Sequence, residues 1–169
     1  MSQVVIRTAR PDDLPVLDAV EASANRAFDG LGLKAPEIPA PPQQAHWVEA
    51  LNAGTLWVAD DASNGVIGFL AAEVVGDGLH IAELDVAFER QQQGHGRRLV
   101  QTAIDFARAR RLAAAMLTTQ RSIAFNGPFY ASMGFAELAS TEAPAWLAAI
   151  LAGEIGRGLE DRCAMRLAL

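Results

Sequence analysis

The stretch that decides the fold is Val86-Ala87-Phe88-Glu89-Arg90-Gln91-Gln92-Gln93-Gly94-His95-Gly96-Arg97-Arg98-Leu99. A strand pattern precedes it, and apolar residues at helical spacing follow it. A helix N-terminus leaves backbone N–H groups unpaired and carries partial positive charge, and glycine lets an anion approach the backbone closely. The turn around Gly94 and Gly96 therefore suits a phosphate group, although it would also suit an ordinary helix start.

Two other kinds of phosphate-binding turn do not match these residues. A Walker loop requires Gly-Lys followed by Ser or Thr, which the stretch lacks. A dinucleotide fingerprint requires a third glycine and a position near the first strand, whereas this turn follows the fourth predicted strand. The turn is therefore not assigned to either class of nucleotide site.

The elements on either side of the stretch have a regular order. Strands are predicted at residues 4–8, 55–60, 66–75, 79–86, 114–119, 135–138 and 163–169, and helices at residues 11–27, 45–52, 96–110, 122–133 and 144–151. Residues 31–44 contain four prolines and are predicted as a loop. Residues 55–86 are typical of an antiparallel meander, and residues 79–119 of a βαβ unit with a parallel strand pair. The predicted fold class is α/β, with a mixed sheet flanked by helices.

Composition limits the class of protein. The 169 residues suit one domain spanning 1–169, and 51% apolar with 20% charged residues are typical of a soluble globular protein. The net charge of -6, without a basic run, argues against nucleic-acid binding and favours a cationic partner such as an amine. No segment has the pattern of a signal peptide or membrane span, so no membrane association and a cytoplasmic location are expected.

The stretch resembles motif A of the GNAT superfamily of N-acetyltransferases, whose pattern is Arg/Gln-x-x-Gly-x-Gly/Ala. Gln91, Gly94 and Gly96 match it, whereas Phe88 stands where the family usually has proline. Downstream, Asn126-Gly127-Pro128-Phe129-Tyr130-Ala131-Ser132-Met133-Gly134-Phe135 resembles the family's motif B. The two motifs and the element order extend the resemblance over nearly the whole chain, and the residues around motif B are similar to those of a bacterial subgroup.

The resemblance implies the GNAT fold, a mostly antiparallel sheet of six or seven strands in which one parallel pair splays apart. It also implies acetyl-CoA as the acyl donor. Backbone N–H groups of residues 92–97 would hold its pyrophosphate, and the strand ending at Val86 would pair with its pantetheine arm. The cofactor-binding residues so implied are Leu84, Asp85, Val86, Gln91, Gln92, Gln93, Gly94, His95, Gly96, Arg97, Asn126 and Phe129.

For three of the polar side chains, the sequence is consistent with two different roles. Arg97 and Arg98 would either add positive charge near the phosphates or form a solvated helix face. Asn126 would either hydrogen-bond the arm of the cofactor or cap its own helix. The residue types alone do not decide between these roles.

Tyr130 is the only tyrosine in the chain and falls on the family's general-acid position. A tyrosine hydroxyl has a pKa of about 10, so it holds its proton at neutral pH and can give it to the leaving thiolate. The alternative is a packed aromatic ring whose hydroxyl is satisfied elsewhere. The resemblance favours the catalytic role.

The base that removes the amine proton is expected on the strand before motif A, where His80 and Glu83 are candidates. Their odd separation places them on opposite faces of a regular strand, unless a bulge intervenes. Glu83 could instead form a salt bridge, and His80 could be a surface histidine at the strand end.

The remaining reactive residues are not expected to take part. Cys163, the only cysteine, alternates with apolar residues and is interpreted as a core residue of the last strand. His46, His80 and His95 show no metal-ligand spacing, so no metal is expected.

The predicted reaction is direct attack by a primary amine of a small molecule on acetyl-CoA in a ternary complex. A peptide or protein N-acetyltransferase and a module that binds acyl-CoA without turnover remain as alternatives. The acceptor side is expected in residues 28–47, where Phe28 and Trp47 either line the site or belong to the core. Members of the family commonly form homodimers.

Overall fold

The computed structural model describes residues 3–34 and 36–169, and its centre is a seven-stranded sheet in the order β1-β2-β3-β4-β5-β7-β6. The strands are β1 (Val4–Thr8), β2 (Leu56–Asp61), β3 (Gly65–Val75), β4 (Gly78–Val86), β5 (Ala114–Gln120), β6 (Ala136–Glu137) and β7 (Arg162–Ala168). Every neighbouring pair is antiparallel except β4 and β5, which are parallel. The predicted mixed sheet with one parallel pair is confirmed.

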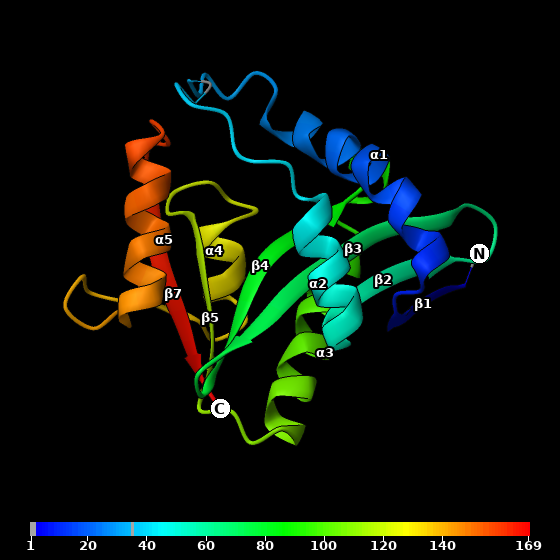
Figure 1. Ribbon diagram of the computed structural model, residues 1–169. Coiled ribbons are helices and arrows are strands. Elements are labelled where there is room, and N and C mark those ends of the chain that lie inside the picture. The colour runs from blue at the N-terminus through cyan, green and yellow to red at the C-terminus, as the bar shows by residue number, and fades with distance from the viewer. Residues whose placement is uncertain (1–2, 35) are drawn as a thin grey trace.

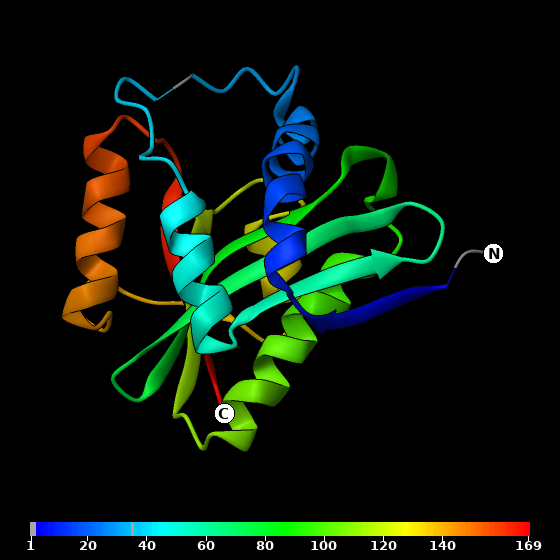
Figure 2. The ribbon, with the colours of Figure 1, turned by 45° about the vertical axis from the view of Figure 1, so that its right-hand side comes forward.

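Helices cover both faces of the sheet (Figures 1 and 2). They are α1 (Leu14–Asn25), α2 (Gln44–Ala53), α3 (His95–Ala109), α4 (Gly127–Ala131) and α5 (Ala145–Gly156). One core joins α3 and Tyr130 of α4 to one face. Two smaller cores join α1 and α2, and separately α5, to the other face. None of the helices in the described ranges has the length and apolar character that a membrane span requires.

The parallel strands β4 and β5 pair only at one end. Residues 78–80 of β4 pair with residues 114–116 of β5, and beyond His80 the two strands separate. A β-bulge lies at this point, because Ala71 pairs with Glu83 while Ala72 pairs with Ile81, which leaves Ala82 as the extra residue. A bulge bends its strand and increases its twist, so it turns β4 away from β5. The splayed pair of the predicted fold is therefore present.

Helix α4 is much shorter than the predicted helix at residues 122–133. Residues before Gly127 are held by the loop that precedes β7 instead of by helical hydrogen bonds. The Asp161 carboxylate accepts from the Ser122 N–H at 2.8 Å, and the Asp161 carbonyl accepts from the Arg121 N–H at 2.7 Å. Pro128 then suits the first turn of the helix, where its missing N–H costs nothing.

Two other helix boundaries also differ from their predictions. The helix predicted at residues 11–27 is an α-helix only over α1, and short 3-10 turns occupy residues 11–13 and 26–28. Helix α5 extends five residues beyond the predicted end at residue 151 and continues through Gly153, which an α-helix tolerates at a cost of about 1 kcal/mol. Neither difference changes the order of elements.

Candidate active site

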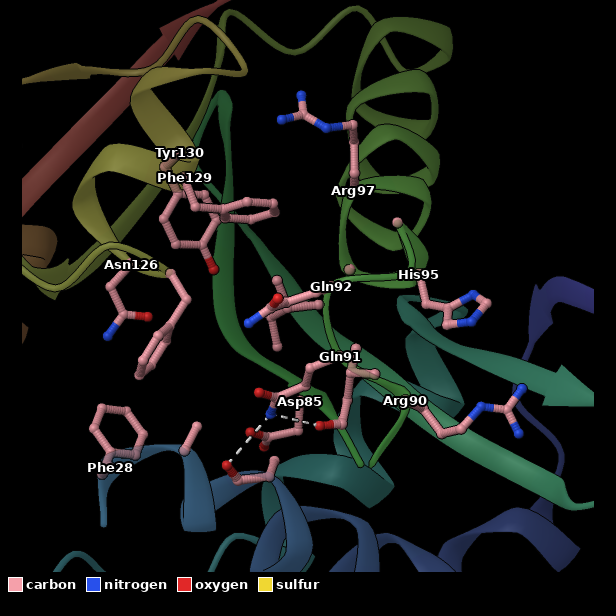
Figure 3. Close-up of a pocket in the computed structure, with 17 residues that line it drawn as sticks. Phe28, Asp85, Arg90, Gln91, Gln92, His95, Arg97, Asn126, Phe129 and Tyr130 are labelled. Atoms are coloured by element: carbon pink, nitrogen blue, oxygen red, sulfur yellow. Dashed lines mark hydrogen bonds between the residues drawn. The ribbon is translucent and has the colours of Figure 1, made fainter. Parts of the chain in front are cut away.

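A cavity of about 370 Å³ opens where β4 and β5 separate, between α1, α3 and α4 (Figure 3). Most of the residues predicted to bind the cofactor line it: Leu84, Asp85, Val86, Gln91, Gln92, Gly94, His95, Gly96, Arg97, Asn126 and Phe129. Gln93 does not, because its side chain turns back to donate a hydrogen bond to the Glu89 carbonyl at 3.2 Å. The structure therefore brings together side chains from both predicted motifs.

The turn before α3 presents its backbone to this cavity. Gly94 has a φ of +84°, and Gln92 also adopts a left-handed conformation with a φ of +58°. Among the hydrogen bonds of the described residues, none is donated by the N–H groups of residues 92–97. The Gln91 amide donates to the Val86 carbonyl at 2.9 Å and to the Ala24 carbonyl at 3.4 Å. Gln91 thus holds the turn in place, and the free N–H groups fit an anionic group.

Two further glycines of the motifs differ in how strictly their surroundings require a residue without a side chain. A Cβ on Gly96 would lie 3.8–3.9 Å from Leu84, Val86 and Phe129, so it would fit but would fill the floor of the cavity. A Cβ on Gly127 would lie 2.3 Å from the Arg121 carbonyl oxygen, which is a severe clash. The predictions did not single out Gly127, although Asn-Gly-Pro is a typical turn sequence.

The arginines of this region differ in their partners and in whether they line the cavity. Arg97 lines the cavity, donates to the Ser132 hydroxyl at 2.8 Å and lies over the Phe129 ring. Arg98 instead donates to the Val4 carbonyl of β1 at 2.9 Å. Arg90 also lines the cavity and pairs with the buried carboxylate of Asp61, a role that the sequence did not suggest. Arg97 therefore adds positive charge to this cavity, whereas the charge of Arg90 is balanced by Asp61.

A second cavity of about 290 Å³ adjoins the first on the side of β5 and β7. The two cavities share Phe28, Leu84, Asp85, Asn126 and Tyr130 in their walls. Phe28, at the end of the first helical segment, packs edge-on against Phe125 with a ring-centroid distance of 5.2 Å. Of its two predicted interpretations, the structure supports the one in which it lines the site. For Trp47 the structure supports the other interpretation, because Trp47 is a core residue that is only 1% exposed.

Tyr130 lies at the junction of the two cavities. Its ring packs edge-on against Phe129 and Phe135, with centroid distances of 5.0 and 5.7 Å. Its hydroxyl points into the space between α4 and β4 (Figure 3). Burial, together with the nearby Asp85 carboxylate, raises the pKa of Tyr130 well above its usual range. The phenol therefore keeps its proton throughout the neutral pH range.

The second cavity is acidic. Glu83 and Asp85 point to its side of β4, and Glu21 faces them from α1. The Trp47 indole N–H donates to the Glu83 carboxylate at 2.6 Å. Burial raises the pKa of Glu83, and burial and then the charge of Glu83 raise the pKa of Asp85 to about 9. At neutral pH the Asp85 carboxyl therefore keeps its proton, which reduces the negative charge of the pair.

His80 lies outside both cavities. The bulge at Ala82 places it on the same face of the sheet as Glu83, so the expected separation onto opposite faces does not apply. Its ring is buried against Trp146, and its Nδ1 lies 3.1 Å from the Glu73 carboxylate. Burial lowers the pKa of His80. The structure thus does not bring His80 to the other predicted site residues.

An ion pair at the second cavity was not predicted from the sequence. Arg162 of β7 contacts Glu154 of α5 twice, with Nη2–Oε1 at 2.9 Å and Nε–Oε2 at 3.0 Å. The Thr118 hydroxyl donates to Glu154 at 2.8 Å. Arg162 is therefore neutralised by its partner and does not balance the carboxylates of β4. The two residues are close in sequence but lie on different elements, so the pair depends on how α5 packs beside β7.

The only cysteine of the chain lines neither of the two cavities. Cys163 is 3% exposed within the core against α3, in keeping with its predicted interpretation. Across residues 3–34 and 36–169, no three His, Cys, Asp or Glu side chains are grouped as metal ligands would be. The polar groups of the cavities are the ones available for chemistry.

Solved structures with the same fold include several acetyltransferases. The Mycobacterium tuberculosis protein Rv2747, solved in complex with CoA, is 21% identical with a TM-score of 0.74, and the match covers 98% of this chain and 99% of that one. A ribosomal-protein-alanine N-acetyltransferase from Brucella melitensis is 22% identical, with 98% and 99% covered and a TM-score of 0.67.

The N-acetylglutamate synthase of Neisseria gonorrhoeae, solved with coenzyme A and N-acetyl-glutamate, is 20% identical with a TM-score of 0.72. The match covers all of this chain but only 36% of the synthase, so the chain spans about a third of that protein. At these identities the structures establish the fold. A family profile goes further, because the one described as "Acetyltransferase (GNAT) domain" matches residues 52–137, half of the chain. The chain therefore belongs to the GNAT family of acetyltransferases, acyltransferases that take the acetyl group from acetyl-CoA.

Proposed function

We propose that this acetyltransferase transfers the acetyl group of acetyl-CoA to a primary amine of a small cationic acceptor. The observation that carries the proposal is the acidic cavity that meets the cofactor cavity at Tyr130. Carboxylates from α1 and β4 line it, and its arginine is already paired with Glu154. An ammonium group would gain from this field, whereas a carboxylate beside the amine would be repelled.

The size of the cavity supports a small acceptor. Its volume of about 290 Å³ lies at the lower end of the range for small-molecule sites, roughly 300–1,000 Å³. The loop segment of residues 36–43 reaches the end of α5, where its Ile38 N–H donates to the Arg157 carbonyl at 3.3 Å. On the side of α5, this loop occupies space through which a bound peptide chain would have to leave the site. A small molecule is therefore favoured over a peptide or protein.

In the proposed reaction Glu83 acts as the general base and Tyr130 acts as the general acid. Glu83 takes a proton from the ammonium group, for which its raised pKa makes it a better base than an ordinary carboxylate. The neutral nitrogen then forms a bond to the acetyl carbonyl carbon. As the carbon–sulfur bond breaks, Tyr130 gives its proton to sulfur. The N–H groups of residues 92–97 would hold the pyrophosphate, and the unpaired edge of β4 would hold the pantetheine arm.

The test is a panel of acceptors assayed with acetyl-CoA. The panel contains diamines and polyamines, neutral amino acids, acidic amino acids and short peptides with free N-termini, and free CoA release and product mass are measured. We expect the highest kcat/KM for an amine with a second positive charge. A preference for acidic amino acids or for peptides would contradict the proposed acceptor class. Tight acetyl-CoA binding without turnover on any amine would instead indicate a binding module.

A prediction about Glu83 arises from its contact with Trp47. Replacing Trp47 with Phe removes the N–H donor that stabilises the Glu83 carboxylate, so the pKa of Glu83 should rise. The acid limb of the kcat–pH profile should therefore move to higher pH. Trp57→Phe is the matched control, because Trp57 is equally buried but packs against Phe106 on the other face. An acid limb that stays in place in Trp47→Phe, or moves equally in the control, would argue against Glu83 as the base.

A further inference from the structure

The second cavity has a single cationic side chain in its wall. Among the described residues that line this cavity, Arg162 is the only basic one. The acidic ones are Glu21, Glu83 and Asp85. A guanidinium keeps its proton throughout the pH range of enzyme assays, so burial does not discharge it as it can discharge a lysine. The effect of Arg162 on a bound acceptor therefore depends on which group compensates its charge.

The compensating group is Glu154, which itself lines neither of the two cavities. Its carboxylate accepts hydrogen bonds from Nη2 of Arg162 at 2.9 Å and from Nε at 3.0 Å. The Thr118 hydroxyl donates to the same carboxylate at 2.8 Å and accepts from Nη2 of Arg162 at 3.3 Å. A two-point contact of this kind is a strong form of arginine–carboxylate pairing. Glu154 is thus fixed against one edge of the guanidinium.

The packing of α5 against the sheet brings the two charges together. Arg162 is the first residue of β7 and lies opposite Gln120 of β5. Leu147 of α5 packs with residues of both strands in one buried cluster, and the helix runs alongside β7 (Figure 1). Glu154 follows Leu147 by seven residues, which places it on the same face of the helix. The Arg162 and Glu154 side chains are only 9% and 13% exposed, so solvent screens the pair weakly.

The counter-charge decides what the wall of the second cavity presents to an acceptor. With the Glu154 carboxylate in place the ion pair is close to neutral, and the carboxylates of α1 and β4 give the cavity its negative field. Without that carboxylate, the full charge of Arg162 would face the cavity. A guanidinium binds a carboxylate well, because it can donate two parallel hydrogen bonds to it. The same wall would then favour an acceptor that carries a carboxylate.

We propose that Glu154 determines the charge class of the acceptor by cancelling the charge of Arg162. Glu154 acts through Arg162 and does not line the cavity, so its role is in specificity and not in catalysis. The acceptors that it excludes are amines with a carboxylate near the amino group, because the guanidinium that would bind the carboxylate is already occupied. This inference rests on the proposed transfer to a cationic amine and names the residue that maintains that preference.

The test compares Glu154→Gln with Arg162→Gln, which remove opposite charges and keep polar side chains. The kcat/KM is measured with acetyl-CoA for two acceptors, glutamate and 1,4-diaminobutane. In Glu154→Gln the ratio of kcat/KM for glutamate to that for the diamine should rise about 10- to 100-fold, the contribution of a hydrogen bond to a charged group. Arg162→Gln should shift this ratio in the opposite direction. A purely structural role would lower both activities in each variant and leave the ratio unchanged, which would overturn the proposal.

Two further variants serve as controls. The double variant Glu154→Gln/Arg162→Gln should return the ratio close to that of the wild type, because neither charge remains. Glu137→Gln is the matched control, since Glu137 also pairs with an arginine, Arg121, at 2.7 Å, but both residues lie outside the two cavities. It should keep the wild-type ratio. An equal shift in Glu137→Gln would show that the effect does not depend on the charge of Arg162.

A binding measurement tests the inference without turnover. Glutarate, which has two carboxylates and no amine, is titrated calorimetrically into the protein with CoA bound. Glu154→Gln should bind glutarate about 10- to 100-fold more tightly than the wild type does, and glutarate should raise its melting temperature. Equal affinity in the two proteins would overturn the proposal.

The result stays decisive if one variant does not fold, since a buried charge without its partner is destabilising. In that case Arg162→Gln should still lower the ratio of glutamate to diamine activity, and the double variant should still restore it. Failure of every acceptor in the amine panel, with the difference in glutarate affinity intact, would refute the proposed function and leave the role of Glu154 standing.

Discussion

Replacing Tyr130 with phenylalanine is expected to lower kcat about 10²- to 10⁴-fold, the contribution of a general acid. Without the hydroxyl, sulfur must leave as an unprotonated thiolate. The ring itself should stay in place, since its edge-on contacts with Phe129 and Phe135 do not involve the hydroxyl. The measurement is the rate of CoA release with the best acceptor of the amine panel, at saturating acetyl-CoA.

Two controls separate chemistry from folding in this variant. The Kd of acetyl-CoA and the melting temperature should match the wild type, because Phe fills the same volume in the core. If Tyr130→Phe keeps wild-type kcat, another group protonates the sulfur and the junction of the cavities has a different role.

The element order follows from local patterns in the sequence, which is why it could be predicted. Strand alternation, the amphipathic spacing in α3 and the glycine turn at Gly94 each depend only on near neighbours. The order of the two motifs along the chain likewise predicted which elements line the first cavity. For these features the physical cause lies within about one helical turn or one strand of the residues concerned.

The parts that were missed depend on how one element pairs with or packs against another. The bulge at Ala82 exists only in register with β3, and it moves Glu83 onto the face of His80. The Arg162–Glu154 pair requires α5 to pack beside β7. Glu83 and Asp85 were considered separately, as a base and as a cofactor contact, although their spacing on a strand signals a pair. The pKa values of the two carboxyl groups are raised mainly by burial, and the burial of a side chain cannot be obtained from the sequence pattern alone.

Replacing Gly94 with alanine is expected to weaken acetyl-CoA binding about 10- to 100-fold, since each hydrogen bond to a charged group contributes about 1.5–3 kcal/mol. The open space around Gly94 means that the methyl group would meet no neighbour. The cause is instead its φ of +84°, which costs an L-residue about 1–2 kcal/mol. Relaxing this strain would rotate the adjoining peptide groups, and the free N–H groups would no longer converge.

The matched control for this variant is Gly65→Ala at the turn between β2 and β3. Gly65 has a φ of +73° and equally open surroundings, but it lies outside both cavities. Both variants should lose similar thermal stability, so calorimetric titration with acetyl-CoA isolates the effect on binding. If Gly94→Ala binds acetyl-CoA as tightly as Gly65→Ala does, the pyrophosphate does not rest on this turn. Weakened binding confined to Gly94→Ala would place it there, because the two substitutions share the same strain and differ only in what the turn faces.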